Sequence, residues 1–172
     1  MAVYNTCALL DNDTVKCWGS GSQGKLGQGT SNPIGDEPNE MGDNLAAIDL
    51  GKGRTAKTVA AGTSQACAVL DNDTLKCWGA NGGLLGQGTV DNVGDEPNEM
   101  GDNLGTTDLG TGRSAQRVGA GQSHTCALLD NDTLKCWGRN ENGQLGQGSA
   151  DTLGDEPNEM GDKLVAIDLG TQ

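Results

Sequence analysis

The sequence predicts an all-β protein of β-propeller-type blades, with about three repeats of 59–60 residues that form an incomplete ring. A cysteine-containing phrase occurs three times: "CALLDNDTVKCWG" at 7–19, "CAVLDNDTLKCWG" at 67–79 and "CALLDNDTLKCWG" at 126–138. The acidic phrase "GDEPNEMGD" recurs with the same period, at 35–43, 94–102 and 154–162. The composition, with 29 Gly and no Phe, favours short strands and turns over one large core.

One repeat, taken over residues 54–110, shows the expected elements in order. "RTAKTVAAG" and "SQACAVL" predict two strands, and "TLKCWGA" predicts a third after the turn "DND". A glycine-rich loop and the acidic connection follow, and "GTTDLG" predicts a short fourth strand. Four short antiparallel strands are what a propeller blade requires. The predicted repeats are 1–53, which lacks its first strand, 54–112 and 113–172.

The two ends of the chain predict association. The opening strands "AKTV" (56–59) and "AQRV" (115–118) have no counterpart before Cys7, and the chain stops at "AIDLGTQ" (166–172). Propellers close with about 4–8 blades, so three blades would leave apolar faces open at both ends. We therefore expect the ends to be covered by other copies of the chain, in a ring or filament, or by the remainder of a longer repeat protein.

The phrase at 121–148, "G…HTCALLD…TLKCWGRN…GQLGQG", resembles the regulator of chromosome condensation repeat family, whose members are mostly seven-bladed β-propellers. With its two relatives, the phrase covers nearly all of the chain. The six cysteines, the acidity and the "GDEPNEMGD" segment differ from the nuclear exchange factor that names the family and are similar to its secreted relatives. The resemblance thus implies the fold, and it does not carry over the nuclear activity.

The cysteine pairs predict disulfides. A three-residue loop, 11–13, would pair Leu9 with Val15 and Cys7 with Cys17 across an antiparallel hairpin. The same register predicts the further bridges Cys67–Cys77 and Cys126–Cys136. Each bridge would stabilise the fold by roughly 2–3 kcal/mol and would indicate an oxidising, extracellular or cell-surface location. Pairs of buried free thiols and a zinc site are the alternative interpretations.

The hairpin tips also match the N-glycosylation sequon Asn-x-Thr. The candidate acceptors are Asn12, Asn72 and Asn131. An exposed tip could carry a glycan without disturbing the core. The alternative is that Asn and Asp are present because they are good turn formers.

The formal charge of −13 and the scattered basic residues argue against nucleic-acid binding, and no apolar run is long enough to insert into a membrane. The acidic phrases are expected to be exposed loops. Their carboxylates are candidate calcium ligands: Asp36, Glu37, Glu40, Asp43, Asp95, Glu96, Glu99, Asp102, Asp155, Glu156, Glu159 and Asp162. The alternative is a solvated helical turn, capped by Asp36 and ended by Gly42.

Other motifs give no catalytic pattern. "GSGSQG" (19–24) has the glycine spacing of a nucleotide-binding loop, but the other repeats do not keep it. His124 is the sole histidine, and the other repeats have Asn5 and Gln65 in its place. The repeated Trp18, Trp78 and Trp137 are expected to pack between blades, with a sugar-binding face as the alternative.

These observations predict a non-catalytic extracellular repeat protein that works through protein contacts, as a self-assembling element or a partner-binding scaffold. No cofactor is expected apart from the candidate calcium. A calcium-dependent adhesion or matrix module is the alternative.

Overall fold

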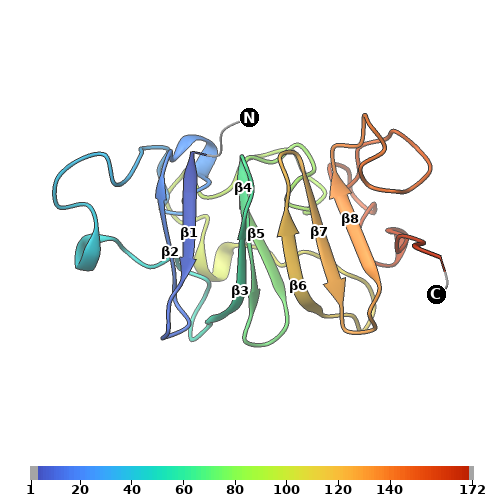
Figure 1. The fold of residues 1–172 in the computed structure, drawn as a ribbon, viewed down its shortest axis with the longest axis horizontal. Coiled ribbons are helices and arrows are strands. Elements are labelled where there is room, and N and C mark those ends of the chain that lie inside the picture. Colours follow the sequence, from blue (N-terminus) through green and yellow to red (C-terminus); the bar gives the residue numbers. More distant parts are fainter. Residues whose placement is uncertain (1–3, 171–172) are drawn as a thin grey trace.

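The computed structural model describes residues 4–170 as three small antiparallel sheets that lie side by side in chain order (Figure 1). In this part of the chain the three sheets do not close into a ring. The ends of the first and last predicted repeats, residues 1–3 and 171–172, lie outside the described residues. The strands are β1 (Asn5–Leu9), β2 (Val15–Gly19), β3 (Ala56–Ala61), β4 (Gln65–Leu70), β5 (Leu75–Gly79), β6 (Ala115–Ala120), β7 (His124–Leu129) and β8 (Leu134–Gly138).

The repeated hairpins β1–β2, β4–β5 and β7–β8 have the predicted register. In the first hairpin Leu9 pairs with Val15 and Cys7 pairs with Cys17. The N–H of Asp13 donates to the Leu10 carbonyl at 3.0 Å, and Asp13 has a φ of 61°. A turn that ends in a left-handed residue is a common three-residue hairpin loop, and Asp tolerates this conformation.

The prediction of a fourth strand in each repeat is wrong. Segment 105–110 contributes no strand, and the N–H of Thr107 donates to the Leu75 carbonyl at 2.8 Å. The Oδ1 atom of Asp108 then accepts the N–H of Gly110, so the chain turns before a ladder can form. The repeats with β3–β5 and β6–β8 therefore have three strands, and the repeat with β1–β2 has two.

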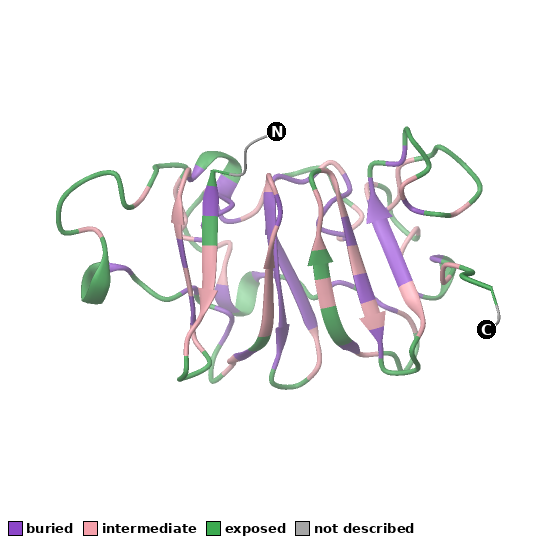
Figure 2. Cartoon of the chain, in the orientation of Figure 1, coloured by how far each residue is buried: buried purple, intermediate pink, exposed green. Residues whose placement is uncertain are grey.

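The core lies between the sheets. On β4, Ala66, Ala68 and Leu70 pack toward the first repeat, while Cys67 and Val69 pack toward the third. Because successive side chains of a strand point to opposite faces, a strand between two neighbours is buried on both sides. Figure 2 shows this burial along the whole of β4, and all six of its residues are buried.

The acidic phrases form loops and not strands, as predicted. Each loop ends in a short 3-10 helix: η2 (Gly42–Asn44), η3 (Gly101–Asn103) and η4 (Gly161–Lys163). A further 3-10 helix, η1, spans Ser22–Gly24. The alternative of a helical turn between Asp36 and Gly42 is wrong, because η2 begins at Gly42, where a φ of 70° suits glycine.

Within residues 4–170 the helical elements are single turns, and none has the length and apolar character that a bilayer crossing requires.

Candidate functional site

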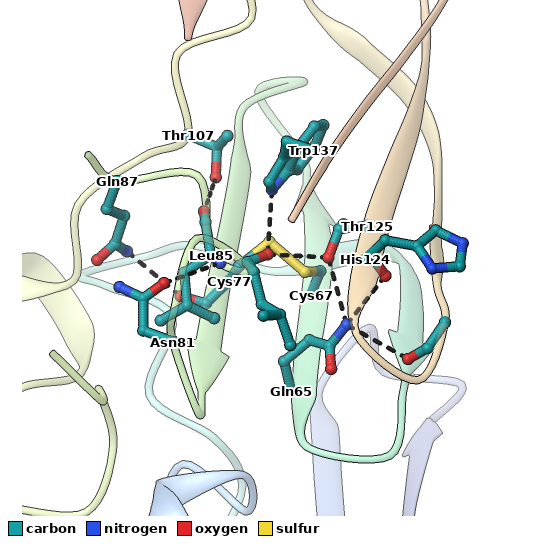
Figure 3. Close-up of a disulfide and its surroundings, with 12 residues drawn as sticks. Gln65, Cys67, Cys77, Asn81, Leu85, Gln87, Thr107, His124, Thr125 and Trp137 are labelled. Atoms are coloured by element: carbon teal, nitrogen blue, oxygen red, sulfur yellow. Dashed lines mark hydrogen bonds between the residues drawn. A yellow bond between two sulfur atoms is a disulfide. The ribbon is translucent and has the colours of Figure 1, made fainter. Parts of the chain in front are cut away.

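The repeat junctions, where one blade packs on the next, bring together most of the residues that the sequence analysis singles out. The bridges Cys7–Cys17, Cys67–Cys77 and Cys126–Cys136 have S–S distances of 2.09, 2.16 and 2.02 Å. They are the pairs that the hairpin register predicts, and the described residues include no free cysteine for a thiol pair or a zinc site. The Cys67–Cys77 bridge packs in the core against the third repeat (Figure 3).

Each junction contains a tryptophan from the following repeat. Trp137 is fully buried, and its Nε1–H donates to the Leu84 carbonyl at 3.0 Å (Figure 3). Gly86 lies so close that an added Cβ would be 2.8 Å from Trp137 Nε1, which explains the glycine. Trp78 is equally buried over Gly27. These two tryptophans are core residues, so they offer no sugar-binding face.

Asn5, Gln65 and His124 occupy the same position in the three repeats. At the junction between the second and third repeats, two of these residues contact each other. Gln65 is fully buried, and its Nε2 atom donates to the His124 carbonyl at 3.1 Å (Figure 3). His124 itself is half-buried and lines a small hollow with Arg139 and Gln144. The backbone of His124 thus takes part in the packing of the second repeat on the third.

A lysine, which the sequence analysis missed, joins the repeats. Lys76 is 7% exposed, and its Nζ atom donates to the carbonyls of Leu50 and Gly101 at 3.0 and 2.7 Å. Burial lowers the pKa of Lys76, and the carboxylates of Asp102 and Asp49 partly oppose this shift. Lysine is rarely buried, so the residue type alone gives no signal in the sequence. The only signal is that Lys76 and Lys135 occupy the same position in two successive repeats.

Lys135 repeats this arrangement at the next junction. Its Nζ atom donates to the carbonyls of Leu109 and Gly161 at 3.0 and 2.8 Å, and burial lowers its pKa as well. In the first repeat, the half-buried Lys16 donates to the Gly42 carbonyl at 2.9 Å. We call Lys76 and Lys135 the junction lysines, because both connect an acidic loop to the preceding repeat.

The acidic loops use their glutamates to fix their own turns. Glu40 Oε2 accepts the N–H groups of Gly35 and Glu37 at 2.7 and 3.1 Å. The hydrogen bond from Glu37 and then that from Gly35 lower the pKa of Glu40. Glu99 and Glu159 accept the equivalent N–H groups in their loops.

The last aspartate of the second and third loops caps a turn of the preceding repeat. Asp102 Oδ1 accepts the N–H of Lys52 at 2.9 Å, and Asp162 Oδ1 accepts the N–H of Thr111 at 2.8 Å. Thr111 Oγ1 also donates to Asp162 Oδ2 at 2.6 Å, and these bonds lower the pKa of Asp162, with the hydroxyl bond contributing most. These carboxylates therefore hold the junctions together.

The twelve candidate calcium ligands are not brought into one cluster in any loop. Within residues 4–170, no three side chains of His, Cys, Asp or Glu converge as a metal site would require. The glutamates Glu40, Glu99 and Glu159 point instead at backbone N–H groups of their own loops. Calcium binding remains a prediction that only a titration can test.

The candidate glycosylation sites lie at exposed hairpin tips. Asn12 Oδ1 accepts the Oγ1–H of Thr14 at 2.8 Å. The pairs Asn72–Thr74 and Asn131–Thr133 have the same bond at 2.8 and 2.7 Å. The geometry suits both interpretations of the sequence, because a turn-forming Asn and an accessible acceptor Asn occupy the same place.

A polar groove runs along each of the two junctions. The first, of about 630 Å³, is lined by the loop 27–29 of one repeat and by Asp49, Glu96, Pro97 and Met100. The second, of about 620 Å³, has equivalent residues: 86–89, Asp108, Glu156, Pro157, Met160 and Asp162. We call these two hollows the junction grooves. The two junction grooves thus present the same kind of surface at successive junctions.

The repeat itself matches a known family. The profile described as "Regulator of chromosome condensation (RCC1) repeat" matches residues 3–25 and 116–144, which include the hairpins β1–β2 and β7–β8. The chain contains RCC1-like repeats. The hairpins that contain the Cys7–Cys17 and Cys126–Cys136 bridges lie within the matched residues.

Two curated relatives show how this RCC1-like chain compares in sequence. It is 30% identical over 157 residues to the ultraviolet-B receptor UVR8 of Arabidopsis thaliana, and it is 28% identical over 174 residues to the E3 ubiquitin-protein ligase HERC2 of Homo sapiens. These alignments cover 86% and 96% of the chain. They span 30% of UVR8 and 3% of HERC2, so the chain corresponds to a part of each relative.

Solved structures support the fold of the RCC1-like chain. Human WBSCR16 superposes with a TM-score of 0.64 at 18% identity, over 96% of this chain and 37% of that one. Prp20p of Saccharomyces cerevisiae superposes with a TM-score of 0.62 at 21% identity, over 87% of this chain and 33% of that one. The three sheets are therefore propeller blades of the RCC1 type, and their number is too small for a ring.

Proposed function

We propose that this RCC1-like chain is a non-catalytic protein-contact scaffold of an extracellular environment, able to assemble with further repeats. The main observation behind the proposal is that equivalent ionisable side chains make equivalent hydrogen bonds in both junctions. Lys76 and Lys135 bind carbonyls, while Asp102 and Asp162 cap turns. An active site is usually one asymmetric site, so identical use in successive repeats supports architecture rather than catalysis.

The junction grooves supply a surface that suits protein contact. Two grooves of nearly equal volume present Glu96 and Glu156 at equivalent places. A repeated site lets a partner with a repeated segment bind twice, which raises its overall affinity without any new type of contact. Yeast Prp20p is described by its binding to Gsp1p and histones and by its complex with Kap60, so protein partners are known for a protein of this fold.

Three observations support the extracellular part of the proposal. Disulfides persist in oxidising compartments, and this small chain has three of them. The net charge of −13 suits solubility and disfavours nucleic acid. The exposed sequons at Asn12, Asn72 and Asn131 are accessible to glycan addition.

The test is native mass spectrometry of the oxidised chain, alone and with fluid from the tissue or culture that produces it. We expect a defined complex, either with copies of itself or with a protein partner. The variants Glu96→Lys and Glu156→Lys change the junction grooves, and Asp11→Lys makes the same charge change at an exposed hairpin tip. A partner complex lost in the groove variants and kept in the tip variant supports the grooves. A monomer that forms no complex under any condition contradicts the proposal.

The compartment is tested separately by mass analysis of the natural protein without reducing agent. Protection of all six cysteines from alkylation is the expected result, since each is in a bridge. Alkylation of the untreated natural protein would show that it resides in a reducing compartment.

A further inference from the structure

The two internal junctions are assembled from the same two halves. One half is a glycine-rich loop, residues 24–29 or 83–88, which we call the docking loop. The other half belongs to the following repeat and is the surface around its tryptophan. In the first junction the N–H of Gly29 donates to the Gly94 carbonyl at 3.0 Å, and in the second the N–H of Gly88 donates to the Gly154 carbonyl at 3.1 Å.

The tryptophan surface occurs a third time without a partner in the described structure. Trp18 is partly exposed, whereas Trp78 and Trp137 are fully buried. Trp18 lines an apolar hollow of about 370 Å³ together with Tyr4, Pro33, Ile34 and Gly35. We call this the Trp18 hollow. In the internal junctions the equivalent surface of Trp137, Leu153 and Gly154 is covered by a docking loop.

The docking loop also occurs a third time without a partner, at residues 143–148. A Cβ added to Gly143 or Gly148 would meet no atom within 4 Å. At the equivalent Gly83 and Gly88, an added Cβ would meet Leu153 O at 3.1 Å and Glu156 O at 3.2 Å. The third loop thus keeps the left-handed glycines of a docking loop, with φ values of 72° and 71°, although the space beside their Cα atoms is open.

From these two halves we infer a heterologous contact: the docking loop 143–148 of one copy binds in the Trp18 hollow of a second copy. The inference rests on the proposed scaffold function and names its partner as this chain itself. By analogy with the second internal junction, Trp18 Nε1–H donates to the Gln144 carbonyl, as Trp137 does to Leu84. The N–H of Gly148 donates to the Gly35 carbonyl, as Gly88 does to Gly154.

Lys16, the equivalent of the junction lysines in the first repeat, completes the contact. Lys76 reaches the Leu50 carbonyl of the preceding repeat, and Lys16 has the same place in the first repeat. In the second copy Lys16 is positioned to reach the Leu169 carbonyl of the first. Because the two faces differ, each copy keeps one free face after one contact, so that the assembly grows until it closes or continues as a fibre.

Two substitutions block one face each. Gly148→Asn places a side chain where a docked copy would lie, and Asn tolerates the left-handed backbone. Gly112→Asn is the matched control, because Gly112 has a φ of 68° and open space around it. Its equivalent, Gly53, has open space even though a neighbouring repeat packs on that blade, so this position is outside the junction. Trp18→Ala removes the anchor from the other face.

The experiment measures the assembly state by sedimentation over a wide range of protein concentration. The wild type and Gly112→Asn should associate, and the concentration for half-association should rise at least about tenfold for Gly148→Asn and for Trp18→Ala. A mixture of these two variants should form a dimer and nothing larger, because each retains the face that the other lacks. Such rescue on mixing also shows that both variants are folded.

Three outcomes would overturn the inference. A wild type that stays monomeric at every concentration has no such contact, although it may bind other proteins as a scaffold. Association that persists in both blocked variants means that the copies meet through another surface, which leaves the scaffold proposal in place. Blocked variants that fail to dimerise on mixing, while each keeps the far-ultraviolet circular dichroism and the cooperative thermal unfolding of the wild type, exclude the two faces as partners.

Discussion

The Nζ atom of Lys76 lies 2.7 Å from the carbonyl oxygen of Gly101, and it also reaches the carbonyl of Leu50 at 3.0 Å. One ammonium group thereby connects an acidic loop with the end of the preceding repeat. A buried lysine is costly unless its donors are used, and here the partners are backbone carbonyls that would otherwise be unpaired. The cohesion of neighbouring blades therefore depends on a polar contact as well as on the core.

We expect Lys76→Met to lower the free energy of unfolding by about 1–3 kcal/mol, because two carbonyls lose their donor in a buried place. Lys16→Met is the control. Lys16 occupies the equivalent position, but it is half-buried and donates to one carbonyl, that of Gly42, so its replacement should cost less, about 1 kcal/mol or below. Urea unfolding followed by tryptophan fluorescence measures both. An equal decrease in the free energy of unfolding for the two variants would show that burial of Lys76 in the junction does not strengthen its hydrogen bonds.

The acid sensitivity of the second junction should depend on Asp162. Hydrogen bonds from Thr111 hold the pKa of this carboxyl below its usual value of 3.8. The folded protein therefore binds this proton less readily than the unfolded chain does. The resulting stability is complete above the unfolded pKa and is lost as the pH falls through the lower folded pKa.

The matched variants are Asp162→Asn and Asp43→Asn. Asp162→Asn should be less stable than the wild type at neutral pH, and the difference should shrink as the pH falls below about 3.8. Asp43 occupies the same place in the first loop, where the described residues place no other repeat against it. Its replacement should change neither the stability at neutral pH nor its dependence on pH. Thermal unfolding across the acid range is the measurement. A stability difference that stays constant with pH would contradict the assigned role of the carboxylate.

Calcium addition should leave the melting temperature unchanged. Glu40, Glu99 and Glu159 already accept backbone N–H groups, and ligation would have to break those bonds. Calorimetry in excess calcium and in excess chelator gives the comparison. A ligand that binds only the folded state raises stability with its concentration. A calcium-dependent increase would thus favour the adhesion-module alternative.

Expression in a eukaryotic secretory host should add glycans at Asn12, Asn72 and Asn131. The tips are exposed, and each has a threonine two residues later. Intact-mass analysis before and after enzymatic removal of N-glycans is the measurement. Thr74→Ala should remove one glycan, whereas Thr74→Ser keeps the sequon and should retain it. A protein without added mass would show that these residues serve as turn formers alone.

The parts of the fold that could be predicted from the sequence are those determined by local chemistry. The register that pairs Cys7 with Cys17 follows from a three-residue turn and strand alternation within the short segment 7–17. The segment 105–110 was harder to assign. Its composition permits a strand, but after the single hydrogen bond from Thr107 to Leu75 the side chain of Asp108 accepts the N–H of Gly110, and the chain turns before a ladder forms.

The junction contacts could not be predicted in the same way, because they join residues of different repeats. The positions of the acidic loops were predicted as exposed, but the bonds of Asp102 and Asp162 to the preceding repeat depend on how blades pack. The fit of Trp137 against Gly86 likewise requires the distance between two blades. Repetition indicates which positions matter, and only the packed structure shows what each one contacts.

The short span of each disulfide has a consequence for how such a chain folds. Near-identical repeats offer every cysteine chemically equivalent wrong partners, and misassembly between similar units is a characteristic failure of repeat proteins. Here each bridge joins cysteines only 10 positions apart. Short loops close at lower entropic cost than long ones, and a hairpin leaving the ribosome can close its bridge before the next hairpin has been made. The order of synthesis thus limits the opportunity for mispairing among look-alike segments, and it does so without relying on the few differences between their sequences.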